Sequence, residues 1–334
     1  MDDNIRLRSA RFRAEREADW RRLSTIVTRA EQSGVRALSF EDARDMAALY
    51  RQAVNSLSVA REISLDKSLL AYLEALTARA YLAVYAPQET LGGLFSRFFR
   101  TSAPQAMRRS APYILLGGLA LFLGALCGYL LFMEDEAWFY VFVGGDTRNP
   151  LSTVEELRAS IYDEYTGSLD GLGAFASYLF SHNTRIAIFV FALGVFAALP
   201  SFLLAFYNGL FFGAFVALYV QRGLGWDIFG WISIHGVTEL SAIIIATGAG
   251  LKLGSAVLFP GRRLRSEALR DEGRDAVKLA VVAGVMLLVA GLLEGFGRQL
   301  VQDLNTRLII GWGIGALWLA WFILGGRNRG QDHG

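Results

Sequence analysis

Hydrophobic and polar positions divide the chain into two parts. Up to about residue 110, apolar residues recur at helical spacing among many charges, which is the pattern of amphipathic helices. Beyond that point the apolar residues form long runs. The first run, 113–132, carries no charge and is long enough to cross the ~30 Å of a bilayer core. The pattern predicts an all-α protein, with a soluble helical domain over 1–110 and a membrane bundle over 111–334.

The first part is predicted to form three helices. The first covers 10–32, the second begins after Ser39 as its N-cap, and the third covers about 64–85 before Pro87. Residues 91–109 then mix phenylalanines with arginines, which indicates an interfacial helix leading into the membrane. The expected apolar stripes are Phe12, Trp20, Leu23, Ile26 and Val27; Ala43, Met46, Leu49, Tyr50 and Val54; and Leu69, Leu70, Leu73, Leu76, Tyr81 and Leu82.

The second part is predicted to cross the membrane about six times. The apolar run 186–220 is too long for one untilted span and short for two. Two crossings with a turn near 200–208 keep the arginine-rich segment 262–274 on the same side as Arg108 and Arg109, so we predict two. The predicted spans are about 112–133, 185–204, 206–222, 228–250, 275–297 and 307–325, with an extracytoplasmic loop over 134–185.

The distribution of charge predicts the orientation. Arginines precede the first span and acidic residues follow it, so the positive-inside rule places both termini in the cytoplasm. We expect the protein to be a multi-pass protein of the cell's inner (plasma) membrane. In the outer loop, Ser152 and Glu155 have the spacing of a capping box. The formal charge of +2 gives no reason to expect nucleic-acid binding, and the single cysteine, Cys127, excludes an intrachain disulfide.

The candidate chemistry lies in one turn of the fourth span. His235 and Glu239 are four residues apart, so a helix places them on one face, with Gly236 between them. Ionisable residues at bilayer depth are costly and normally face a bundle interior. Glu294 in the fifth span and Asn183, beside His182 at the start of the second, are at a depth where they could join the same polar cluster.

Three interpretations of this cluster remain open. It is a hydrogen-bonded clamp between helices, a site for transport or lipid handling, or a metal or catalytic site. The metal interpretation is the weakest, because His235 and Glu239 supply two ligands where zinc needs at least three, and no His-Glu-x-x-His motif is present. We therefore predict no metal, no cofactor and no enzymatic activity. Asn208 and Gly209 indicate a helix-cap turn or a half-helix end.

Small residues recur at the spacing of membrane helix contacts. Pairs of glycines four residues apart let helix backbones approach closely, so we predict a compact bundle and, as a further expectation, a homodimer. The pairs are Gly124/Gly128, Gly209/Gly213, Gly250/Gly254, Gly291/Gly295 and Gly311/Gly315.

The order of several motifs is similar to that of the stage II sporulation protein M family. The motifs are His182-Asn183, Asn208-Gly209-Leu-Phe-Phe-Gly213, His235-Gly236-Val-Thr-Glu239-Leu, Gly248 to Gly254, and Pro260-Gly-Arg-Arg. The N-terminal part resembles that of the long-form relatives. The resemblance implies a polytopic inner-membrane protein whose namesake anchors cell-wall-degrading partners, and for the long forms an association with MoxR-type ATPases.

The resemblance and the domain plan together lead to one functional expectation. The protein is expected to be a membrane scaffold that recruits cytoplasmic or envelope proteins, with a link to envelope remodelling. The alternative is a component of a transporter or lipid-translocating system that uses His235 and Glu239, and the remaining alternative is an intramembrane metalloenzyme.

Overall fold

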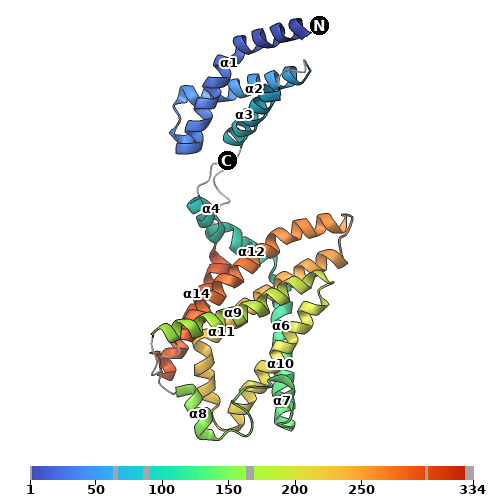
Figure 1. Cartoon of the computed structure of the whole chain (residues 1–334). Coiled ribbons are helices and arrows are strands. Elements are labelled where there is room, and N and C mark those ends of the chain that lie inside the picture. The colour runs from blue at the N-terminus through green and yellow to red at the C-terminus, as the bar shows by residue number, and fades with distance from the viewer. Residues whose placement is uncertain (1, 63–66, 86–90, 163–168, 298–299, 328–334) are drawn as a thin grey trace. The chain divides into compact units, whose positions relative to one another are not determined.

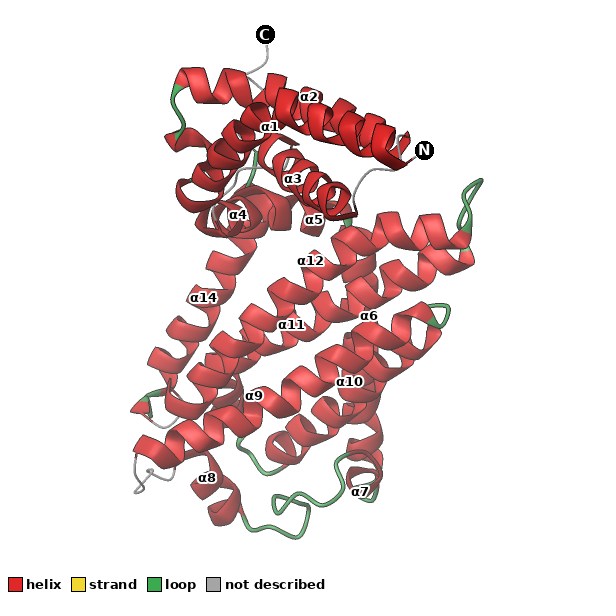
Figure 2. Cartoon of the chain, turned by 45° about the horizontal axis from the view of Figure 1, so that its top comes forward, coloured by secondary structure: helices red, strands yellow, loops and turns green. Residues whose placement is uncertain are grey.

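The computed structural model describes residues 2–62, 67–85, 91–162, 169–297 and 300–327. Every regular element in these ranges is a helix (Figure 2), as the sequence predicted. The chain divides into two compact units, Met1–Leu94 and Phe95–Gly334 (Figure 1).

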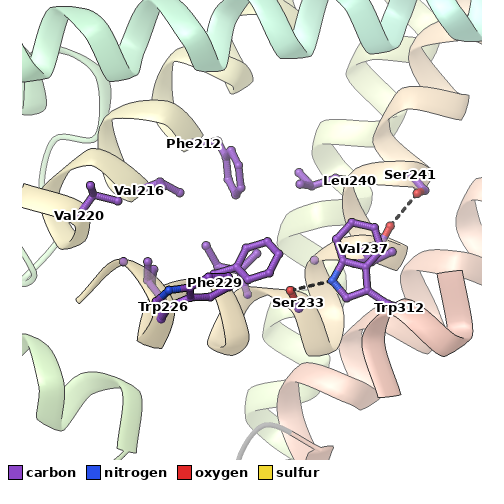
Figure 3. Close-up of a pocket in the computed structure, with 14 residues that line it drawn as sticks. Phe212, Val216, Val220, Trp226, Phe229, Ser233, Val237, Leu240, Ser241 and Trp312 are labelled. Atoms are coloured by element: carbon purple, nitrogen blue, oxygen red, sulfur yellow. Dashed lines mark hydrogen bonds between the residues drawn. The ribbon is translucent and has the colours of Figure 1, made fainter. Parts of the chain in front are cut away.

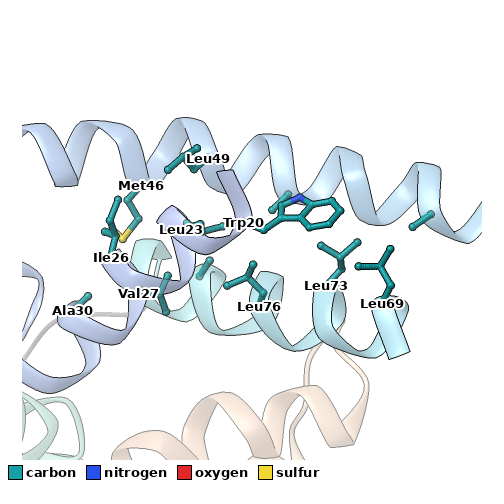
Figure 4. Close-up of a cluster of buried hydrophobic side chains, with 14 of the residues drawn as sticks. Trp20, Leu23, Ile26, Val27, Ala30, Met46, Leu49, Leu69, Leu73 and Leu76 are labelled. Atoms are coloured by element: carbon teal, nitrogen blue, oxygen red, sulfur yellow. The ribbon is translucent and has the colours of Figure 1, made fainter. Parts of the chain in front are cut away.

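The first unit is a layer of three helices with its own core. They are α1 (Asp2–Ser33), α2 (Phe40–Glu62) and α3 (Lys67–Tyr85), with a 3₁₀ turn at Val35–Ala37 after α1. Ser39 caps α2 as predicted, because its Oγ accepts a hydrogen bond of 3.1 Å from the Asp42 backbone N–H. The side chains of Trp20, Leu23 and Leu73 meet in the centre of the layer (Figure 4).

Two of the predicted apolar stripes are shifted. On α2 the buried residues include Met46, Leu49 and Ala53, whereas Val54 is 41% exposed, because the helix face turns by one position relative to the prediction. On α3 the stripe holds for Leu69, Leu73 and Leu76, but Tyr81 and Leu82 at its end are exposed. The end of α3 therefore presents apolar surface that the core of this unit does not cover.

Within its described residues, the second unit contains six helices that are long and apolar enough to cross a membrane, which is the predicted number. In both views of the unit, α6 and α10 lie side by side (Figures 1 and 2). Its elements are α4 (Leu91–Arg97, which begins in the first unit), a π-helical turn (Phe98–Ser102), α5 (Ala103–Arg109), α6 (Ala111–Glu134), α7 (Trp138–Phe142), α8 (Val154–Tyr162), α9 (Leu169–Ala192), a 3₁₀ turn (Leu193–Val195), α10 (Leu199–Gln221), α11 (Gly225–Leu258), α12 (Arg265–Leu292), a π-helical turn (Leu293–Gly297) and α14 (Leu304–Leu324).

The second and third spans lie earlier in the sequence than predicted. The chain breaks at 193–198, not at 200–208, and the predicted loop 134–185 ends where α9 begins at Leu169. Ala197 and Ala198 adopt positive φ angles of 59° and 64° at this break. Pro200 follows in the first turn of α10, where its missing N–H costs no helical hydrogen bond. The polar run from Ser181 to Arg185 resembles a loop but is helical.

The capping box predicted at Ser152 is also displaced by one residue. Thr153, not Ser152, precedes α8, and its hydroxyl accepts from the Glu156 backbone N–H at 3.2 Å. The Glu156 carboxylate accepts from the Thr153 N–H at 2.8 Å. Ser152/Glu155 and Thr153/Glu156 both match the capping-box pattern, and the residue at which α8 begins determines which pair forms the cap.

The glycine pairs lie at helix crossings within this one chain. Gly124 and Gly128 of α6 face Gly209 and Gly213 of α10, where a Cβ on Gly209 would collide with the carbonyl oxygen of Leu121. The other three pairs also face neighbouring segments of the same unit. The pairs are thus explained by packing inside the bundle, and the homodimer stays a prediction without their support.

Two arginines at the start of the bundle join its helices. Arg108 donates to the carbonyl oxygens of Phe322 and Gly325 at 2.8 and 2.7 Å, which satisfies acceptors at the C-terminal end of α14. Arg109 binds both carboxylate oxygens of Asp275 on α12. We call this the arginine-rich end of the bundle, since the segment 262–274 lies at the turn between α11 and α12.

Candidate functional site

Three ionisable side chains from two helices meet inside the bundle. His235 and Glu239 come from one turn of α11, and Glu294 comes from the segment after α12. One ligand-type atom from each lies within 4.8 Å of the others, and His235 Nε2 is 3.8 Å from Glu294 Oε1. His235 and Glu294 are buried, and Glu239 is partly buried. We call these three residues the polar triad.

A local departure from α-helical geometry positions Glu294. Residues Leu293–Gly297 form a π-helical turn directly after α12. Such turns insert one extra residue and are frequent at functional sites. Gly295 in this turn lies so close to Ala176 on α9 that a Cβ at position 295 would collide with the Ala176 Cβ, so the turn is packed tightly against α9.

A small cavity of about 150 Å³ reaches the triad. His235 and Glu239 line it together with aromatic side chains and Arg148 from the loop before α8. The Arg148 guanidinium carbon lies 4.8 Å from the centre of the Phe215 ring and 5.7 Å from that of Trp231. A cation stacked on aromatic faces thus forms part of the wall of this cavity.

Arg148 is fixed in place by Asp146. Its Nε and one terminal nitrogen donate to the two carboxylate oxygens at 3.0 and 2.8 Å. Burial lowers the pKa of the Arg148 guanidinium, but the hydrogen bonding to Asp146 together with the negative charge of that carboxylate and its neighbours raises the pKa above its usual value. The guanidinium is therefore charged, and Asp146 neutralises it locally.

A second, larger cavity adjoins the first. It has a volume of about 740 Å³, and Trp226, Phe229 and Trp312 lie along it (Figure 3). Few polar side chains line this cavity. One of them, Ser233, accepts a hydrogen bond of 3.3 Å from the Trp312 indole (Figure 3). The two cavities share four lining residues, Phe212, Ile232, Gly236 and Leu240.

The remaining predicted site residues lie elsewhere, apart from Gly236, which lines both cavities. Asn183 is buried on α9 but is not among the residues of the triad or of the two cavity walls. His182 is exposed and stacks on Tyr178, with 6.3 Å between the two ring centres. The expected turn at Asn208 and Gly209 is wrong, since both lie within α10, and Asn208 donates to the Leu204 carbonyl oxygen at 2.8 Å.

Sequence reasoning overlooked the half-buried Arg148 and the buried Lys252. Arg148 lies in a loop where no motif was recognised, and its only local signal is Asp146 two residues earlier. Lys252 lies on α11 at the arginine-rich end, where its ammonium group is 3.1 Å from Glu272 and 3.7 Å from Asp275. A single lysine in an apolar span was the available signal, because a charge there needs partners.

Six apolar helices with a buried polar triad define a polytopic helical membrane protein. The model of the family described as Stage II sporulation protein M matches residues 113–297, which is more than half of the chain. The protein belongs to this family, and the family resemblance noted in the sequence is confirmed. Residues 10–86 match the model of a domain of unknown function (DUF8413). No curated protein and no solved structure matches the chain.

Proposed function

We propose that the protein is a membrane scaffold, in which the bundle is the anchor and the first unit recruits a partner protein. The observation that carries this proposal is a cluster of three tyrosines on the first unit. Tyr50, Tyr81 and Tyr85 have ring centres 5.1 to 6.5 Å apart. Tyr81 and Tyr85 are 52% and 61% exposed.

The cluster has the composition of a protein interface. Tyrosine combines a large apolar surface with a polar end and is enriched where proteins bind each other. Leu82, 60% exposed, extends the same end of α3 with more apolar surface. The first unit also has a core of its own, so it presents this surface on a folded support.

The partner we propose is a cytoplasmic protein, and a MoxR-type ATPase is the first to test because the family resemblance implies it. This assignment requires the arginine-rich end to face the cytoplasm, with both termini on that side of the inner membrane. The arginines of 262–274, together with Arg108 and Arg109, support that orientation by the positive-inside rule.

Site-specific photocrosslinking in native membranes tests the proposal. A photoreactive phenylalanine analogue replaces Tyr81 or Tyr85, and Phe40, which is 85% exposed on the same unit, serves as the matched control position. We expect one defined protein adduct from positions 81 and 85 and none from position 40. Equal adducts from all three positions, or none from any, would contradict the proposal.

A second function is favoured by the two adjoining cavities. The large one is apolar and the small one carries Arg148, His235 and Glu239, so together they match an amphiphile with an apolar chain and a zwitterionic head, whose phosphate Arg148 would bind. Under this alternative the protein belongs to a lipid-handling or transport system. The bundle would then bind a lipid and not act only as an anchor.

Lipid retention separates the two functions. Protein purified in mild detergent is analysed by native mass spectrometry for bound phospholipid. Under the alternative, Arg148→Gln lowers the retained phospholipid several-fold, whereas Arg222→Gln, which changes an arginine outside both cavity walls, does not. The scaffold alone predicts equal retention in the two variants and in the wild type.

A further inference from the structure

The strongest unassigned feature of the molecule is the polar triad itself. The sequence offers two ligands on one face of α11, His235 and Glu239, which is too few for a metal. The fold adds Glu294 from the segment after α12. We propose that His235, Glu239 and Glu294 bind one divalent transition-metal ion within the membrane bundle.

The donor set suits such an ion. One imidazole nitrogen and two carboxylates are ligands for Zn²⁺, Mn²⁺ or Fe²⁺. Ligand atoms around a tetrahedral zinc lie ~3.3 Å apart, given bonds of about 2.0–2.1 Å. His235 Nε2 and Glu294 Oε1 are 3.8 Å apart, and all three ligand atoms lie within 4.8 Å. Side-chain rotations that bring the ligand atoms up to about 1.5 Å closer together close that difference.

Charge balance points the same way. Two carboxylates in an apolar bundle are costly unless a positive charge compensates them. Among the described residues that line the small cavity, Arg148 is the permanent cation, and both oxygens of Asp146 hold it. A divalent ion with a neutral His235 would bring the triad to a net charge of zero.

The small cavity supplies the remaining coordination position. His235 and Glu239 line this cavity of about 150 Å³, so a bound ion would have one side open to it. A water molecule takes up ~30 Å³ of liquid, and the cavity therefore has room for metal-bound water. Three protein ligands with an open position are the arrangement of an accessible zinc site and not of a closed structural one.

Direct metal binding to the full-length protein tests this inference. The chain is purified in detergent with an affinity tag that contains no histidine, stripped with chelator, and incubated with Zn²⁺ or Mn²⁺. Bound metal is measured by mass spectrometry after gel filtration. We expect about one ion per chain, a higher apparent Tm with metal, and at least tenfold weaker binding in His235→Gln, Glu239→Gln and Glu294→Gln.

Matched controls keep the result specific. His182→Gln and Glu134→Gln change the same residue types outside the triad and should bind like the wild type. Less than a tenth of an ion per chain in the wild type, or equal binding in all variants, would overturn the inference.

Weaker binding in a variant could also result from misfolding, so a second experiment looks for a new spectroscopic signal from the metal site. His235→Cys should bind Co²⁺ with a thiolate-to-cobalt absorption band in the near ultraviolet, which the wild type with its native Cys127 should lack. Bound Co²⁺ without this band in His235→Cys would show that position 235 is not a ligand. The result is independent of partner recruitment by the first unit.

Discussion

Arg109 and Asp275 join α5 to α12 through two hydrogen bonds of 2.8 and 2.7 Å. The pair is asymmetric, because the Arg109 side chain is 52% exposed and that of Asp275 only 13%. Asp275 also faces Lys278 at 3.2 Å and the buried Lys252 at 3.7 Å. One carboxylate therefore holds three cations at the arginine-rich end.

This asymmetry predicts unequal effects of removing either partner. Asp275→Ala leaves the buried Lys252 paired with Glu272 and should cost ~2–4 kcal/mol of stability. Arg109→Ala should cost ~1 kcal/mol because the Arg109 charge reaches solvent. The measurement is the apparent Tm of detergent-purified protein. A decrease in Tm for Arg109→Ala as large as that for Asp275→Ala would contradict this prediction.

The glycine crossing of α6 and α10 should not tolerate a methyl group. In Gly209→Ala the new Cβ would meet the Leu121 carbonyl oxygen, so the helices must separate and packing is lost, at a cost of ~2 kcal/mol or more. Gly284→Ala in α12 is the control, since nothing lies within 4 Å of a Cβ there. The control should be neutral or slightly stabilising because alanine favours a helix. Thermal unfolding of both variants checks this, and equal losses would refute it.

The first unit is expected to fold alone. Its core encloses Trp20, which is 2% exposed, so the isolated segment 1–94 should be helical and unfold cooperatively. Trp20→Ala should cost ~3–5 kcal/mol and abolish that transition. Phe40→Ala, at an exposed position, should leave the transition unchanged. Circular dichroism melting curves provide the measurement, and a non-cooperative wild-type curve would argue against an independent unit.

Acid should weaken the contact between α1 and α3 in this unit. The hydrogen bonds from Arg79 hold the pKa of Glu31 below its usual value of about 4.3. A lowered pKa in the folded state means that the contribution is present above about pH 4.3 and is lost as the pH falls through the folded-state pKa. The effect is small because the pair is exposed.

Urea unfolding of segment 1–94 at several pH values can detect this contribution. Glu31→Gln should reduce the loss of stability on acidification, whereas Asp19→Asn, an exposed carboxylate on the same helix, should not. The same acid sensitivity in Glu31→Gln and the wild type would exclude the assignment.

Local patterns in the sequence were sufficient for the number of spans and for the pairing of His235 with Glu239. Both depend on composition or on spacing within one helix. The depth of Glu294 in the fifth span indicated that it could join this pair. Its contact with His235 depends on the packing of α12 against α11 and on a π-helical turn, which spacing within one helix cannot express. Arg148 was missed for the same reason, because its cavity forms only when the loop folds over the bundle.

The errors at Asn208 and at Ser181 to Arg185 have a different origin. Asn-Gly and short polar runs favour turns in isolation. Within α10, Gly209 instead permits close contact with α6, and the Asn208 amide donates to a carbonyl of its own helix. Tertiary packing therefore outweighs the local preference at these positions.

The π-helical turn at Leu293–Gly297 makes the triad sensitive to chain length as well as to residue type. A helix advances by about 100° per residue. Deleting Leu293, the residue of this turn that precedes Glu294, would rotate Glu294 relative to α12 and away from His235, although all three triad residues would still be present in the sequence. A relative with one residue fewer here would keep the His-Gly-x-x-Glu motif but lose the third member of the triad.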